Sequence, residues 1–141
     1  MSIWFTKPTP EAINMASEKT IAKIIGIEVV EVGDDFIRGR MPVDERTHQP
    51  FGILHGGASV VLAESLGSMA ANFSVDGSKF YCVGLDINAN HISSVRSGWV
   101  EGVARPIHIG RSTQVWEIRI TSDTNKLVCI SRLTMSVLER K

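Results

Sequence analysis

The sequence lacks an excess of either charge. Its 141 residues carry 15 basic and 15 acidic side chains, which cancel to a formal net charge of zero at neutral pH. Nucleic acids and anionic membrane surfaces are bound through clustered positive charge. We therefore expect neither a nucleic-acid partner nor a membrane partner.

Cysteine is equally scarce. Cys82 and Cys129 are the only two, and each lies in an alternating apolar run typical of a strand. A disulfide scaffold would use far more cysteine, so we interpret both as reduced thiols of the core. The four histidines lack the H-E-x-x-H and C-x-x-C spacings of zinc sites, so we expect no metal.

Long hydrophobic runs are absent too. No window approaches the roughly 20 apolar residues that cross a bilayer, and residues 1–8 contain no signal-peptide core. We expect a cytoplasmic protein with a single domain over residues 1–141, because 43% hydrophobic and 21% charged residues are ordinary globular values. The G-x-S-x-G elbow, the phosphate loop and the dinucleotide glycine pattern are also missing, and we expect no cofactor.

The chain does contain a regular succession of turn and periodicity signals. Thr9 and Pro10 mark the start of a helix that runs to Ile25, where Gly26 can end it in a left-handed conformation. A second, apolar helix is predicted over Ala58–Phe73. Alternating residues predict strands at Ile27–Val32, Phe36–Val43, Phe80–His91, Trp99–Ile109, Ser112–Thr121 and Leu127–Leu138.

The short connections between these strands imply antiparallel neighbours. A sheet with its long helix on one face belongs to the α+β class. Because the second helix is apolar on all sides, either the sheet must wrap around it or a partner subunit must cover its outer face.

One carboxylate interrupts this apolar helix. Glu64 is the only ionisable side chain between Gly56 and Ala71, and burying an unpaired carboxylate is costly. We interpret Glu64 as a general base or nucleophile in a dry cleft. The alternative is a structural carboxylate satisfied by an arginine or by backbone donors. Ser68 lies on the same helix face and can orient the carboxylate, hold a water or serve close packing.

The residues before this helix form a second candidate group. Gly56 and Gly57 leave bare backbone where a helix has unsatisfied N–H groups and a positive dipole end, so a carbonyl oxygen gaining negative charge would be stabilised there. Alternatively, the glycines serve unusual dihedral angles or close strand contact. His55 either acts as a base or, as we favour, orients the loop. Gln49 donates to a substrate carbonyl or satisfies loop backbone. A carboxylate with backbone donors suits acyl transfer to water.

The run from Gln49 to Ser68, QPFGILHGGASVVLAESLGS, resembles the signature of hotdog-fold acyl-CoA thioesterases of the 4-hydroxybenzoyl-CoA thioesterase type, whose helix carries a glutamate. Val83–His91 and Pro106–Arg111 resemble the same group. The resemblance covers nearly the whole chain and implies an antiparallel sheet wrapped around a long central helix. It is strongest to bacterial members that hydrolyse 1,4-dihydroxy-2-naphthoyl-CoA in menaquinone synthesis or clear mischarged aryl carrier proteins.

The resemblance also implies a role for each motif residue. Glu64 would be the base or nucleophile, and the Gly56 amide would donate to the oxyanion. Gln49 and His55 would assist on the carbonyl side, and Ser68 would be a partner of the attacking water. Residues that match the pantetheine and nucleotide path are Gly84, His91, Ile109, Gly110 and Arg111. The implied substrate is an acyl- or aryl-CoA thioester, or the same acyl group on a carrier protein.

Two other functions remain as alternatives. A hotdog hydratase or dehydratase would carry an Asp-His pair near the helix start, and this chain lacks the aspartate after Phe51-Gly52. A non-catalytic acyl-CoA-binding module has no need of a lone carboxylate beside the thioester.

The spacing of the two candidate groups predicts a composite site. Gly56 and Glu64 are 64 − 56 = 8 positions apart on one helix, which is roughly 12 Å along its axis. One chain can hardly bring both to a single thioester carbon. Two antiparallel copies of the helix around a twofold axis can do so. We therefore expect a homodimer, and the resemblance implies that it doubles to a homotetramer.

Overall fold

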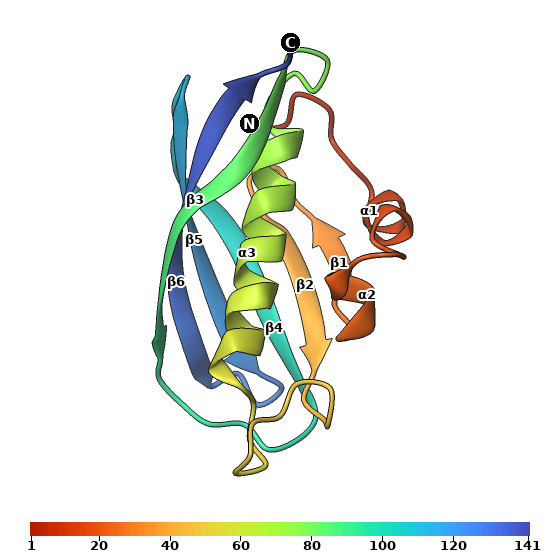
Figure 1. Cartoon of the computed structure of the whole chain (residues 1–141), viewed down its shortest axis with the longest axis vertical. Helices are drawn as coiled ribbons and strands as arrows, with labels where there is room; N and C mark the ends of the chain where they lie inside the picture. Colours follow the sequence, from red (N-terminus) through yellow and green to blue (C-terminus); the bar gives the residue numbers. More distant parts are fainter.

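The computed structural model describes residues 1–141 and confirms the α+β class (Figure 1). Three helices accompany one six-stranded sheet with the strand order β1-β2-β4-β5-β6-β3. All five strand pairings are antiparallel. The elements are α1 (Pro10–Ala16), α2 (Ile21–Ile24), β1 (Glu28–Val32), β2 (Ile37–Pro42), α3 (Gly56–Phe73), β3 (Phe80–His91), β4 (Trp99–Ile109), β5 (Thr113–Ser122) and β6 (Leu127–Glu139).

The sheet curves around α3, which runs along its concave face (Figure 1). The helix buries Leu62, Ala63 and Leu66 in a core cluster of 25 hydrophobic residues. Leu66 fits a hollow in the sheet because Gly39 and Gly102, which face each other across β2 and β4, carry no side chains there. A Cβ atom at position 102 would lie 2.9 Å from a Leu66 methyl carbon. Close contact with glycine backbone thus fixes how deeply the helix sits in the sheet.

The predicted first helix is wrong in one respect, because it is two short helices separated by Ser17–Thr20. The Ser17 hydroxyl donates to the Ile13 carbonyl at 2.9 Å, and the Thr20 hydroxyl donates to the Ser17 carbonyl at 2.8 Å. Such local bonds from Ser and Thr compete with helical backbone bonds. Gly26 ends the segment with a φ of +81°, as predicted.

An asparagine from a neighbouring helix protects each edge of the sheet. Asn14 bonds both the N–H and the C=O of Val29 on β1, at 2.8 and 2.9 Å. Asn72 bonds the N–H and the C=O of Cys82 on β3, at 2.8 and 3.1 Å. Beyond Cys82, the outer edge of β3 has no neighbouring strand, and its side chains are largely exposed. This part of β3 is the longest open strand edge in the chain.

The two cysteines are free thiols in the core, as predicted. Burial raises the pKa of both Cys82 and Cys129, so neither is a reactive thiolate at neutral pH. None of the three helices has both the length and the apolar character needed to cross a membrane.

Candidate active site

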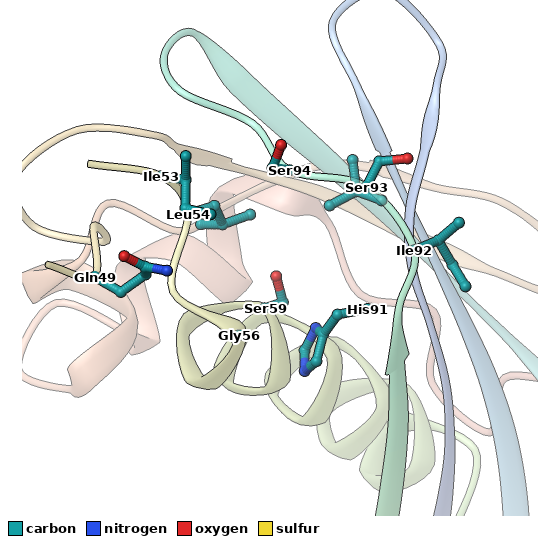
Figure 2. A pocket seen from close by; sticks show the side chains of 10 residues that line it. Gln49, Ile53, Leu54, Gly56, Ser59, His91, Ile92, Ser93 and Ser94 are labelled. Carbon is teal, nitrogen blue, oxygen red and sulfur yellow. The ribbon is translucent and has the colours of Figure 1, made fainter. Parts of the chain in front are cut away.

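A tight loop before α3 holds Gln49. The Gln49 N–H donates to the Ile53 carbonyl, and its carbonyl accepts from Gly52, each at 2.9 Å. The Gln49 side-chain oxygen accepts a hydrogen bond from the Phe51 amide. Because that oxygen is engaged with the loop, the side-chain NH₂ is the free end, and Figure 2 shows it on the cavity side. The glutamine therefore satisfies the loop and still presents a donor.

His55 caps the N-terminus of α3. Its Nδ1 accepts a hydrogen bond from the Gly57 amide at 2.7 Å, and its carbonyl accepts from Ala58 and Ser59 at 3.0 and 3.2 Å. The structure therefore gives His55 the orienting geometry that the sequence favoured over a base. These bonds occupy three of the amides at the helix start, and the Gly56 amide donates to no group of the protein. It is a free donor at the positive end of a helix of 18 residues.

The Gly56 amide opens into a cavity of about 340 Å³. The His91 ring, at the end of β3, lies beside the first turn of α3 (Figure 2). Its Nε2 would be 2.8 Å from a Cβ atom added to Gly56, so a side chain at position 56 would displace the ring. The cavity is lined by Gln49, Ile53, Leu54, Gly56, Ser59, His91, Ile92, Ser93, Ser94 and Val128. Its lining mixes polar and aliphatic side chains.

Glu64 lies in a different cavity, of about 410 Å³, that shares no lining residue with the first. Its side chain is half-buried, whereas the sequence predicted a buried one, because α2 and the connection before it cover only part of the outer face of α3. Ser68 lines the same cavity, but its hydroxyl contacts the sulfur of Met135 at 3.7 Å and makes no bond to Glu64. The lining residues are Ser17, Thr20, Ile21, Ala22, Val61, Glu64, Ser65, Ser68 and Met69.

The residues expected along the pantetheine and nucleotide path also fall into two groups within one chain. His91 pairs with Cys129 at the start of β6, near the Gly56 cavity. Gly110 and Arg111 form the turn between β4 and β5, next to the end of β6. Gly84 lies on β3 beside the Glu64 carboxylate, and Ile109 precedes the turn on β4. One chain therefore does not bring the five predicted residues together.

The sequence missed the wall that faces Glu64. Ser17 and Thr20 come from the connection between α1 and α2, and Ile21 is the first residue of α2, in an N-terminal region with little motif. No spacing or residue type marked these positions, since hydroxyl and aliphatic side chains are common in any helix connection. Only the tertiary fold places them opposite the carboxylate.

The family model described as the thioesterase superfamily matches residues 51–129, which is more than half of the chain. The chain belongs to the thioesterase superfamily. This segment runs from the loop after Gln49 through α3 to β6, so it includes both Gly56 and Glu64.

Related thioesterases match over nearly their whole lengths. The chain is 49% identical over 136 residues to the 1,4-dihydroxy-2-naphthoyl-CoA hydrolase of Escherichia coli, covering 96% of this chain and 99% of that protein. It is 47% identical over 137 residues to the proofreading thioesterase EntH of Cronobacter turicensis, covering 96% and 98%. The crystal structure of a Q49A variant of a thioesterase from Pseudomonas aeruginosa matches with a TM-score of 0.97 at 52% identity, covering 99% of this chain and 100% of the other.

These matches confirm the predicted hotdog fold and the predicted activity: the protein is a thioesterase. They leave the roles of individual residues to the geometry described above.

Proposed function

We propose that this thioesterase hydrolyses an aryl- or acyl-CoA thioester to the free acid and CoA, using the Gly56 amide and the Glu64 carboxylate. The observation that carries the proposal is that α3 has both a free amide at its start and a single carboxylate further along. The amide suits a developing oxyanion, and the carboxylate suits activation of the attacking group.

In the proposed reaction, the thioester carbonyl accepts hydrogen bonds from the Gly56 amide and the Gln49 side-chain NH₂. Glu64 removes a proton from water as the water oxygen attacks the carbonyl carbon, or Glu64 itself attacks and water releases the acyl group. When water attacks, collapse of the tetrahedral intermediate breaks the C–S bond, and the departing CoA thiolate takes up the proton that Glu64 removed from water. When Glu64 attacks, the same bond breaks to leave an acyl-glutamate anhydride, and the thiolate takes up a proton from the water that then hydrolyses this anhydride. His55 keeps the amide aimed by capping the helix, and Ser68 helps to hold the water.

We further propose that each site combines two chains of a homodimer. The separate cavities of Gly56 and Glu64 support this, because they lie about 12 Å apart along α3 and one substrate carbon cannot reach both. A second copy that pairs antiparallel along the open edge of β3 would bring the Glu64 cavity of each chain to the Gly56 cavity of the other. The exposed Val83 and Leu85 on β3, at 43% and 67%, fit such an interface. Dimers of this kind would pair further into the expected homotetramer.

The same antiparallel pairing would also bring together the two groups of residues expected along the pantetheine and nucleotide path. His91 of one chain would approach Gly84, Ile109, Gly110 and Arg111 of the other, so that pantetheine and nucleotide follow one continuous path. The Arg111 side chain is exposed and forms no ion pair within the chain. It is therefore free to meet a phosphate.

For the acyl group we propose a ring, as in 1,4-dihydroxy-2-naphthoyl-CoA, the substrate named for the E. coli relative. Val61, Met69 and Ile21 give the Glu64 cavity apolar walls suited to a flat apolar group. Such a substrate would place the enzyme in menaquinone synthesis and in the cytoplasm. The second candidate is an acyl group on an aryl carrier protein, supported by the proofreading thioesterase among the relatives.

The test is steady-state hydrolysis of an aryl- and acyl-CoA panel, with matched carrier-protein thioesters, by wild type and Glu64→Gln. We expect wild type to prefer aryl-CoA, and Glu64→Gln to lose at least about 100-fold in kcat while keeping its fold. Binding of an uncleavable acyl-CoA analogue should survive the substitution. A Glu64→Gln variant that hydrolyses aryl-CoA near the wild-type rate would show that Glu64 is not the catalytic acid.

A further inference from the structure

The Glu64 carboxylate has an unusual neighbour on β3. An ideal Cβ atom added to Gly84 would overlap Oε2 of Glu64 and lie 3.3 Å from its carboxyl carbon. The next nearest atom is a methyl carbon of Leu133, at 4.0 Å. The space that a side chain at position 84 would occupy is therefore taken by the carboxylate and by nothing else.

The backbone of Gly84 does not itself require glycine. Its φ lies outside the left-handed region, which among the glycines is occupied by Gly26, Gly52 and Gly98. An alanine could adopt the same backbone conformation without strain. The absence of a side chain at position 84 thus has one visible consequence, which is room for the acid of α3.

The strand is irregular at this point. β3 is the edge strand of the sheet and runs beside α3 (Figure 1), and its register with β6 shifts between Gly84 and Asp86. Such a bulge bends a strand locally and re-aims the side chains around it. Bulges are common beside active sites.

We propose that Gly84 is a positioning residue for catalysis: its bare backbone forms the slot that sets where the Glu64 carboxylate points. This inference rests on the proposed role of Glu64. It assigns Gly84 a role in kcat, distinct from the contact with pantetheine that the resemblance implied. A methyl group in the slot would push the carboxylate aside, because a flexible side-chain end yields before the backbone of a sheet does.

The first experiment compares Gly84→Ala with the matched control Gly77→Ala. Gly77 also has a φ outside the left-handed region, and an added Cβ there meets nothing within 4 Å. We expect Gly84→Ala to lower kcat about 10- to 100-fold, as a displacement of about 1 Å can do. KM should change little, and the melting temperature should stay within about 2 °C of wild type. Gly77→Ala should match wild type in kcat and in KM.

The second experiment repeats the Gly84→Ala substitution in a Glu64→Asp background, where the side chain that carries the carboxylate is one methylene shorter. In Glu64→Asp the carboxyl carbon takes the place of the glutamate Cγ, which is no closer to the added Cβ than the Leu133 methyl carbon at 4.0 Å. The aspartate oxygens would then lie about where the glutamate Cδ does, at 3.3 Å from the added Cβ and not overlapping it, so alanine at position 84 should have little to displace. We expect Gly84→Ala to lower kcat by less than about threefold in the Glu64→Asp background, which is the coupling expected of residues in contact.

Two outcomes would contradict the positioning role of Gly84. One is a Gly84→Ala enzyme with wild-type kcat while Glu64→Gln is inactive, which would leave the proposed catalytic acid standing. The other is an equal loss of stability from Gly84→Ala in the wild-type and Glu64→Ala backgrounds, which would assign the glycine to the sheet. Full activity of both Glu64→Gln and Gly84→Ala would instead contradict the proposed function itself.

Discussion

The two cavities along α3 are lined by different kinds of groups. At the start of the helix, backbone amides, a capping histidine and a hydrogen-bonded loop create a site with both polar and aliphatic lining. Around Glu64, eight residues later, side chains from α3, from α2 and from the connection before α2 make a more apolar cavity around one carboxylate. The first cavity suits an oxyanion because it offers a free amide, and the second suits an acyl group because its walls are more apolar. Neither cavity holds both of the groups that the proposed reaction uses.

Removing the free Gly56 amide should have the largest effect on activity, and it tests whether this amide binds the oxyanion. Gly56→Pro deletes the N–H, and proline is well tolerated at the first position of a helix. We expect kcat to fall about 100- to 1,000-fold, the usual cost of losing one oxyanion donor. The control is Gly56→Ala, which keeps the amide but requires the His91 ring to move, since Nε2 is 2.8 Å from the new Cβ. Equal losses in the two variants would assign the effect to His91 and not to the amide.

A smaller effect should separate the two roles of His55. His55→Ala removes the cap and should cost about 1 kcal/mol of stability, together with about tenfold in kcat. His55→Asn keeps an N-cap acceptor for the Gly57 amide, and we expect it to recover the wild-type melting temperature and most of kcat. A stable His55→Asn enzyme that is as inactive as Glu64→Gln would make the imidazole a base, contrary to the capping geometry.

The smallest effect is expected at the nucleotide end of the path. Arg111→Ala should raise KM for a CoA thioester several-fold and change kcat by less than about twofold, because it removes uniform binding. Arg105→Ala is the control, since that guanidinium is engaged with Asp35 at 3.0 Å and lies over the Phe36 ring. A loss in kcat at constant KM would count against a phosphate contact for Arg111.

The helix-start side of the Gly56 cavity could be predicted from sequence because its signals are local, whereas the opposite wall, from His91 to Ser94 and Val128, comes from the distant end of β3, the segment after it and β6. A histidine and two glycines before an apolar helix specify a cap and bare amides within four positions. The Ala58–Phe73 helix and the strands were likewise predicted within a few residues of their ends, since periodicity and turns fix them. Gly26 ended its helix as expected, because its left-handed φ is a backbone requirement.

The Glu64 cavity could be predicted only in part, because its other walls are tertiary. The carboxylate stood out in an apolar helix, but its half-exposed state depends on how far α2 and the connection before it reach over α3. The break at Ser17–Thr20, which supplies that wall, depends on hydroxyl bonds that compete with the helix. Strand pairing, which no local pattern reveals, places Leu66 between Gly39 and Gly102. The tertiary fold likewise places Gly84 beside Glu64.

The proposed division of one site between two chains is tested most directly by complementation. Glu64→Ala and Gly56→Pro chains are co-expressed with different tags, and dimers carrying both tags are purified. In a mixed dimer, the intact Gly56 of one chain meets the intact Glu64 of the other, so one of the two sites is whole. We expect mixed dimers to recover about half of the wild-type kcat per dimer, while each parent dimer stays inactive. Mixed dimers as inactive as their parents would place the whole site within one chain and contradict the composite arrangement.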